Sequence, residues 1–523
     1  MKVSQETFDS IVSENVEEFE LSLHEARKEA VEQLKRQGAD LSEVDISGGT
    51  AKQDARTEME KAVQVIAGAS KVETARNTLL AALMVIQAVS KNEQRQAALS
   101  AFGIKDGSGA LAALLQACVP AEIPDWEVLS ATLIAWRQVI IRDDTARDAF
   151  RWRGGAQSVV AAMRYAAKNN NDDCRIAALE LIAAAATRCE SNKGALAKAG
   201  VCSDLAKALV TKNDNLLKSA ARAVCTIAAA DDTRSATSAS FDTSRALVDA
   251  GAVEALIQAL KVIKNSSDLL VALRQLAKSD EAVKRIIRNG GAAICADIID
   301  TFCFQDTKLA IKAVGLLRNL AANDDAKDRI CSDGTLDALF KLALHYPRET
   351  LLIEHTLATI AQIALRKPSN AIKILNKSGI QLILDAMRNH PTHAATQRQA
   401  CLAIRNLVAR LGLDALAQDN AKNTAIQGFL DDGAEDLLRK ASTQSSANVD
   451  VAYAALRDLG ISVQISTYEL GQDGRGELVP KAHFGDKANV NFRPVFGASD
   501  DIDDKISQAD AQGSAPLTAF SLM

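Results

Sequence analysis

Residues 306–336 read DTKLAIKAVGLLRNLAANDDAKDRICSDGTL. The first half of this stretch carries apolar residues at helical spacing, which form one broad face: Leu309, Val314, Leu316, Leu317 and Leu320. Asn323 and the two aspartates after it are residue types that cap helix N-termini, and a second amphipathic run then leads to Gly334. The stretch therefore predicts a long helix, a short helix and a sharp corner at the glycine, with each helix buried on one side.

The corner at Gly334 has counterparts along the chain. A polar residue or Ala, then Gly, then a small residue and an apolar run recur at Gly109, Gly154, Gly200, Gly251, Gly290, Gly334, Gly379 and Gly433, with spacings of 39 to 54 residues. A left-handed residue between two helices favours glycine, because glycine has no Cβ to clash. Repeats of this length must stack to bury their apolar faces. We predict an all-α fold, a right-handed α-solenoid of about eight armadillo-like repeats.

The composition is that of a globular, helical chain. Of 523 residues, 48% are hydrophobic, 24% are charged and only 4% are aromatic. The net charge of −5 removes any broad attraction to nucleic acid or to anionic membranes. The longest uncharged run, residues 107–121, is too short to span a bilayer. We expect no nucleic acid and no membrane among the partners, and a protein of the cytoplasm, the nucleus or both.

The two ends differ from the middle. Residues 1–45 carry 12 acidic and 5 basic side chains and predict an acidic N-terminal helical arm. That arm is either a cap on the first repeat or a docking or autoinhibitory element, and both alternatives stay open here. We predict a linker at 46–52, the armadillo-repeat solenoid at 53–460, a C-terminal cap segment at 461–480 and a disordered tail at 481–523.

Two motifs, Leu317-Arg-Asn-Leu320 and Ile404-Arg-Asn-Leu407, resemble the armadillo repeat family, whose third helix carries an Asn before a Leu. Segments within residues 3–33 and 364–460 are also similar to one particular member of that family. The resemblance implies a non-enzymatic interaction protein in which the third-helix Asn holds the backbone of an extended peptide. Asn319 and Asn406 match that position, Gln138, Gln275 and Gln362 substitute for it, and Thr226 and Ala185 depart from it. Trp136 is the only Trp near such a position, which argues against a nuclear-import adaptor.

An arginine precedes that position in several repeats. The pairs are Arg137-Gln138, Arg274-Gln275, Arg318-Asn319, Arg405-Asn406 and Arg457-Asp458, and they form our predicted partner groove. A spaced row of guanidiniums can bind carboxylates or phosphates bidentately, which favours an acidic or phosphorylated partner peptide. Alternatively, each arginine bridges to Asp or Glu of the adjacent repeat and fastens the stack. The sequence permits both roles.

Catalytic signatures are missing from the sequence. The six histidines are scattered, the nine cysteines include no Cys-x-x-Cys pair, and no phosphate-binding glycine motif is complete. We therefore predict no enzyme, no catalytic residues, no metal and no cofactor. The predicted function is a protein-binding scaffold or adaptor that captures a polypeptide segment along its groove, and we expect a monomer. The alternative is a regulatory transport- or chaperone-type factor whose acidic arm competes for the groove.

Overall fold

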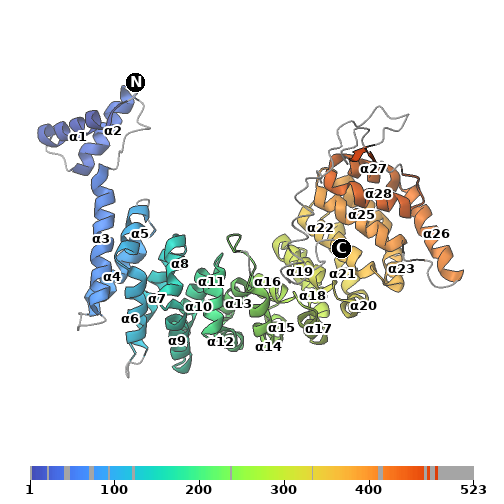
Figure 1. The fold of residues 1–523 in the computed structure, drawn as a ribbon, viewed down its shortest axis with the longest axis horizontal. Helices are drawn as coiled ribbons and strands as arrows, with labels where there is room; N and C mark the ends of the chain where they lie inside the picture. The colour runs from blue at the N-terminus through green and yellow to red at the C-terminus, as the bar shows by residue number, and fades with distance from the viewer. Residues whose placement is uncertain are drawn as a thin grey trace. The chain divides into compact units, whose positions relative to one another are not determined.

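The computed structural model describes residues 3–19, 23–39, 48–69, 76–91, 95–119, 124–235, 238–332, 334–409, 411, 416–463, 468–470 and 478–480. The chain divides into two parts, residues 1–455 and 456–523, and each is considered by itself. In the first part the ribbon passes through helical repeats in chain order (Figure 1).

Eight three-helix repeats follow one another within the described residues. Their first helices are α5 (Arg95–Ile104), α8 (Asp144–Trp152), α11 (Glu190–Lys198), α14 (Ser240–Asp249), α17 (Asp280–Arg288), α20 (Asp324–Ser332), α23 (Pro368–Asn376) and α26 (Leu416–Asp431). Their second helices are α6 (Gly107–Cys118), α9 (Gly155–Lys168), α12 (Val201–Ala208), α15 (Ala252–Val262), α18 (Gly291–Ile298), α21 (Thr335–His345), α24 (Gly379–Asn389) and α27 (Ala434–Gln444). Their third helices are α7 (Trp126–Ile140), α10 (Asp172–Ala186), α13 (Asp214–Ala228), α16 (Ser267–Leu276), α19 (Thr307–Leu320), α22 (Thr350–Ala364), α25 (Ala394–Val408) and α28 (Val449–Asp458).

Two helices precede the first repeat, α3 (Gly48–Ala69) and α4 (Arg76–Val89), and they pack on α6 and α7 as the second and third helices of a repeat would. A π-helical turn, η1 (Ile299–Cys303), extends α18, and a 3₁₀ turn, η2 (Ser446–Asn448), precedes α28. The α3 helix begins at Gly48, so residues 48–52, which we predicted as linker, are helical. Ala51, Lys52 and Gln53 are good helix formers, which explains the extension.

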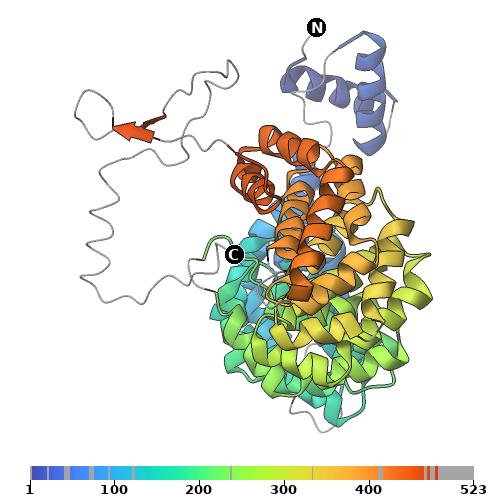
Figure 2. The same ribbon diagram turned by 90° about the vertical axis from the view of Figure 1, so that its right-hand side faces the viewer.

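The repeats stack through equivalent helices. Each third helix from α4 to α22 contacts the third helix of the next repeat, and α12, α15, α18, α21, α24 and α27 form a second ladder in the same way. Figure 2 views the repeats end-on, with the yellow and orange later repeats in front of the green and blue earlier ones. The apolar face predicted around Leu316, Leu317 and Leu320 is fully buried between these ladders. The prediction of an all-α solenoid of about eight repeats is confirmed for the first part of the chain.

Six of the eight predicted corner glycines have a left-handed backbone, with φ from 72° to 89°. The first and seventh corners differ from the prediction. There the left-handed residues are Asp106 (φ 53°) and Ser378 (φ 63°), while Gly109 lies inside α6 and Gly379 is the first residue of α24. The side chain of Asp106 accepts a hydrogen bond from the Gly109 N–H at 3.2 Å, which helps a non-glycine residue to hold this conformation.

Gly379 serves a different purpose from a left-handed corner. A Cβ at this position would lie 2.7 Å from the backbone oxygen of Ile374, so the preceding helix approaches too closely for a side chain. Gly291 makes the same close approach, because its Cβ would lie 2.9 Å from the oxygen of Ile286. The sequence pattern therefore marks every corner, but the residue that takes the left-handed conformation shifts with local packing.

Buried cations join the first and third helices of a repeat. Lys193 is fully buried, and its Nζ donates to the backbone oxygen of Ala229 at 2.6 Å and to Glu190 at 2.9 Å. Lys327, also fully buried, donates to the oxygen of Leu365 at 3.0 Å. Ala229 and Leu365 are the C-terminal capping positions of α13 and α22, where unpaired carbonyls attract positive charge. Each lysine, on the first helix of its repeat, thus satisfies the end of the third helix of the same repeat.

The acidic arm folds as a helix pair with a core of its own. Helices α1 (Gln5–Phe19) and α2 (Leu23–Arg36) bury Phe8, Val12, Ala26, Ala30 and Leu34 against one another. The buried Asn15 amide donates to the backbone oxygen of Ala26 at 3.2 Å. Because Phe8 and Val12 pack inside this pair, neither the capping nor the docking alternative can rely on them as an open apolar face.

The second part of the chain contains the only described β-structure, two strands of three residues each. Strand β1 (Tyr468–Leu470) pairs antiparallel with β2 (Leu478–Pro480) inside the predicted C-terminal cap segment. Gly460 (φ 80°) follows α28 in a left-handed conformation, and the Ile461 N–H donates back to the oxygen of Leu456 at 3.0 Å, which stops the helix. The predicted tail, residues 481–523, lies outside the described residues. No helix in the described ranges offers an apolar stretch long enough to traverse a bilayer.

The corner geometry can be tested with two glycines that have open space around the missing Cβ. Gly251 has φ +89°, whereas Gly194 lies inside α11. We expect Gly251→Ala to lower the free energy of unfolding by about 1–2 kcal/mol, because Ala resists the left-handed conformation. Gly194→Ala should instead raise it by about 0.5–1 kcal/mol, since Ala favours a helix. Urea unfolding followed by circular dichroism measures both, and equal effects would contradict the assignment.

Candidate partner-binding face

The third helices α4, α7, α10, α13, α16, α19, α22 and α25 present one continuous surface, which we call the third-helix face. Arg137 and Gln138 lie on it from α7, Arg274 and Gln275 from α16, Arg318 and Asn319 from α19, and Arg405 and Asn406 from α25, all half-buried. Arg457 and Asp458 belong to the second part of the chain. The structure thus brings four of the five predicted pairs onto equivalent third-helix positions in the first part.

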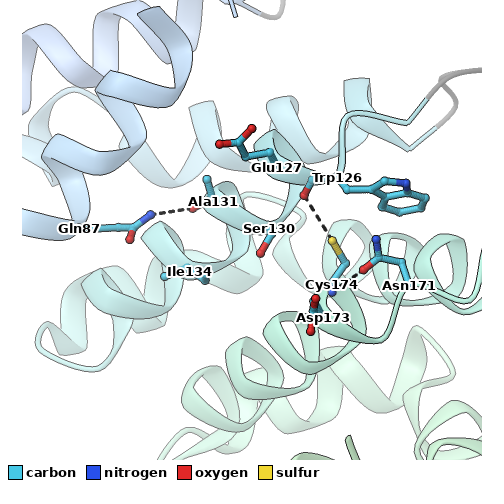
Figure 3. Close-up of a pocket in the computed structure, with 9 residues that line it drawn as sticks. All are labelled: Gln87, Trp126, Glu127, Ser130, Ala131, Ile134, Asn171, Asp173 and Cys174. Atoms are coloured by element: carbon cyan, nitrogen blue, oxygen red, sulfur yellow. Dashed lines mark hydrogen bonds between the residues drawn. The ribbon is translucent and has the colours of Figure 1, made fainter. Parts of the chain in front are cut away.

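One hollow of about 380 Å³ lies between α4, α7 and α10. It is lined by Gln87, Trp126, Glu127, Ser130, Ala131, Ile134, Asn171, Asp173 and Cys174 (Figure 3). The Gln87 amide donates to the backbone oxygen of Ala131 at 3.3 Å, and Trp126 packs against Tyr165 with ring centroids 5.5 Å apart. We call this the N-terminal hollow.

A second hollow of about 330 Å³ follows on α7, α10, α13 and α16, and we call it the central hollow. It is lined by Arg137, Ile141, Glu180, Ala183, Ala184, Thr187, Ser219, Arg222, Cys225, Thr226, Asp268 and Val271. Small and apolar side chains dominate its floor. Burial raises the pKa of the Cys225 thiol, which therefore stays protonated at neutral pH.

Ion pairs connect neighbouring repeats across this face. Arg137 Nε lies 3.4 Å from Glu180 of the next repeat, and Arg318 Nη1 lies 3.3 Å from Glu354. Arg222, which was not among the predicted residues, pairs with Asp268 at 3.1 Å. These partly exposed pairs each contribute little to stability, but they neutralise the arginines within the solenoid. The bridging role is thus realised at Arg137 and Arg318.

The asparagines also join repeats. Asn319 Nδ2 donates to the backbone oxygen of Arg274 at 3.3 Å, and Asn406 Nδ2 donates to that of Ala361 at 2.8 Å. Both acceptors lie on the third helix of the preceding repeat. In this structure, therefore, the side-chain amides of Asn319 and Asn406 donate their hydrogen bonds to the preceding repeat.

The other residues near the asparagine position behave differently. Gln138 accepts a hydrogen bond from Arg142 of its own repeat at 2.8 Å. Ala185 is fully buried, and Ala184 lines the central hollow at the equivalent position, so our alignment of this repeat was wrong by one residue. Trp136 is also fully buried and packs on Phe150, with centroids 5.1 Å apart, so it contributes to the core and not to the surface.

A buried histidine connects three repeats farther along the face. His355 Nδ1 lies 3.0 Å from Arg318 Nη1, and since a guanidinium can only donate, the neutral ring carries its proton on Nε2. Burial lowers the pKa of His355, the Arg318 and Arg274 guanidiniums lower it further, and Glu354 opposes them. His355 is therefore neutral at physiological pH.

The sequence analysis missed residues of this face, among them Trp126, Glu180, Arg222, Glu354 and His355. Glu180 and Arg222 lie three residues before Ala183 and Cys225, the counterparts of Arg137, so they share the exposed side of their helices. An i, i+3 search around the arginine position would have found these two. Within the described residues, no group of three His, Cys, Asp or Glu side chains is placed to bind a metal.

Comparison with known proteins agrees with this geometry. Residues 1–61 match the family model of the armadillo repeat-containing protein 6 N-terminal domain. The chain is 29% identical to armadillo repeat-containing protein 6 of Homo sapiens over 393 residues, covering 71% of this chain and 75% of the relative. The chain is thus similar to armadillo repeat-containing protein 6 over most of its length. The homologue of armadillo repeat-containing protein 6 in Drosophila melanogaster is 25% identical over 369 residues, covering 70% of this chain and 77% of that one.

Solved structures share the armadillo solenoid. One is an engineered protein with a TM-score of 0.54 and 20% identity, and the match covers 78% of this chain and all of the engineered one. Another comes from work on a phosphorylation switch that controls the interaction between cadherin and beta-catenin, with a TM-score of 0.56 and 16% identity over 78% of this chain and 79% of that one. These likenesses establish the fold, and the sequence relatives connect it to armadillo repeat-containing protein 6.

The role of Asn406 can be separated from partner binding. We expect Asn406→Ala to lower the free energy of unfolding by about 1 kcal/mol, because the inter-repeat hydrogen bond to Ala361 is lost. Gln362 is the matched control, since it is half-buried at the equivalent position of α22 and, among the described residues, no hydrogen bond engages its side-chain amide. Gln362→Ala should change stability by less than half as much in the same urea titration. Equal losses would argue against the inter-repeat bond.

The lowered pKa of His355 makes stability depend on pH. Below about pH 6.5 the unfolded chain protonates this histidine while the folded chain still excludes the proton. Acidification through that window therefore lowers the free energy of unfolding, and higher pH has no effect through this group. We expect the loss between neutral and mildly acidic pH to be smaller in His355→Gln, whose amide oxygen can accept the Arg318 bond. Identical pH profiles of the two proteins would contradict this.

Proposed function

We propose that this armadillo-repeat protein is a non-enzymatic scaffold that captures an extended polypeptide segment along its third-helix face. The observation that supports this most directly is the succession of the N-terminal and central hollows over five consecutive third helices, α4 to α16. Such a surface offers an elongated path for a chain and no enclosed pocket for a small substrate.

The dimensions of the face suit an extended segment. Packed helices lie about 8–10 Å apart, and an extended chain advances about 3.3 Å per residue, so about three residues of a partner would cross each repeat. The hollows are large enough for single side chains, and the ion pairs that line the central hollow leave polar groups beside the path. Cadherin binding by beta-catenin, a protein of the same fold, is a precedent for a protein partner.

The chemistry of the preferred segment follows from the remaining positive charge. Arg274, whose guanidinium pairs with no carboxylate among the described residues, is the arginine of the row that most favours an acidic or phosphorylated segment. We propose a monomer that works in the cytoplasm, the nucleus or both. A second candidate function is regulatory, because residues 1–45 carry 12 acidic and 5 basic side chains and could compete for the same arginines.

Site-specific photo-crosslinking tests capture on this face. Ile141 lines the central hollow and is 43% exposed, whereas Val262, at the end of the second helix α15, is 83% exposed. A photoreactive residue at position 141 should crosslink a discrete polypeptide segment in cells, identified by mass spectrometry, while the same residue at 262 should not. Because Val262 is the more exposed of the two, equal crosslinking patterns would contradict the proposal.

A deletion of residues 1–45 discriminates between the two candidate functions. If the acidic arm competes for the face, its deletion should increase crosslinking from position 141. An unchanged yield from a well-folded deletion variant would remove the regulatory alternative and leave the scaffold proposal in place.

A further inference from the structure

One arginine of the row differs from the others in what it contacts. Arg137, Arg222 and Arg318 each pair with a carboxylate of the next repeat. The Arg274 guanidinium, in contrast, has no hydrogen bond or ion pair within the part of the chain that the structure describes. It is nevertheless half-buried on α16, one turn beyond Val271 of the central hollow. Its charge is therefore unmatched among the described residues, whereas those of Arg137, Arg222 and Arg318 are matched.

A glycine on the neighbouring helix makes room for this arginine. A Cβ on Gly315 of α19 would lie 3.0 Å from Arg274 Nη1 and 3.3 Å from His355 Cδ2. The Arg274 guanidinium thus lies directly over the backbone of α19, beside the histidine. Glycine inside a helix costs stability relative to Ala, and here its absent side chain provides the space for Arg274 and His355.

Positive charge converges at this glycine. Arg318, on the same helix as Gly315, donates to His355 at 3.0 Å, and both Arg274 and Arg318 lower the pKa of that histidine. Glu354 is the carboxylate that offsets part of this charge, through Arg318. Two guanidiniums and one carboxylate leave a net positive charge in a partly desolvated place, where an anion is bound more strongly than in open water.

We propose that Arg274 and Arg318, on either side of Gly315, form a binding site for a single anionic side chain, a carboxylate or a phosphate, of the captured segment. The site rests on the proposed function, because it lies on the same third-helix face and adds a defined anchor to it. Arg274 supplies the free guanidinium, while Arg318 is shared with Glu354 and His355. The central hollow, with its matched ion pairs, receives the uncharged side chains next to the anion.

Nuclear magnetic resonance of the full chain labelled with ¹³C-histidine tests the site through the His355 signal. The probes are a short alanine peptide with a central phosphoserine, the same peptide with glutamate, and the same peptide with serine. We expect the phosphoserine or glutamate peptide to shift the His355 signal saturably and to raise its pKa, because a nearby anion stabilises the imidazolium. The serine peptide should do neither. Comparison of the two anionic peptides distinguishes phosphate from carboxylate as the preferred group.

Three variants test whether the anionic peptides bind at Arg274 and Gly315. Arg274→Gln should weaken anion binding about tenfold, and Arg137→Gln, which removes an arginine already paired with Glu180, should leave it unchanged. Gly315→Ala should also weaken binding, because its methyl group would displace the Arg274 side chain, while the melting temperature stays the same or rises. This last variant separates loss of the site from loss of folding.

The outcomes also separate this site from the proposed function. A His355 signal that responds to neither anionic peptide, or equally to the serine peptide, would overturn the anion site. So would an Arg274→Gln variant that binds as the wild type does. If position 141 crosslinks a segment but the anionic peptides leave the His355 signal unchanged, the binding face is retained and only the anion site at Arg274 and Arg318 is removed. Anion binding without crosslinking would retain the anchor and remove the captured segment.

Discussion

Burial between neighbouring repeats is the interaction on which the whole solenoid depends. A third helix such as α19 carries leucines on a face too wide for its own repeat to cover, so Leu316, Leu317 and Leu320 are buried only when α16 and α22 lie against it. The left-handed corners make this stacking possible, because they return the chain between the first and second helices within one or two residues. The left-handed corners and the apolar faces of the third helices are therefore both required for the stacking of repeats.

Hydrogen bonds of buried polar side chains add to the stabilisation that apolar stacking provides. Lys193 and Lys327 are buried where the third helix of their own repeat ends, and Asn319 and Asn406 donate to carbonyls of the repeat before. The asparagine bonds cross a repeat boundary, whereas the lysine bonds hold the first helix of a repeat against the third. A buried amide or ammonium without a partner would cost stability, so these bonds favour one packing within each repeat and one spacing between repeats. The same spacing sets the positions of the side chains on the third-helix face.

The third-helix face combines neutralised and unneutralised charge. Along the central hollow the arginines and carboxylates alternate, Arg137 with Glu180 and Arg222 with Asp268, and their pairing leaves a nearly neutral, small-residue surface. Toward α19 the pattern changes, because Gly315 lets Arg274 lie across the helix beside His355. A face of this kind distinguishes partners by the position of one charge along a segment more than by their total charge.

The sequence by itself determined the repeat, the corners and the helical class, because glycine chemistry and apolar periodicity are local properties that residues within one repeat express. It also indicated which residues share a position on the third helices, including the arginines and Asn319 and Asn406. Which of those side chains are already bound was decided only by the tertiary structure. Glu180, Glu354 and His355 come from the next repeat, and the backbone acceptors for the asparagines come from the one before. Residues more than thirty positions apart meet only when repeats stack, so the contrast between a matched Arg137 and an unmatched Arg274 is a property of the assembled solenoid.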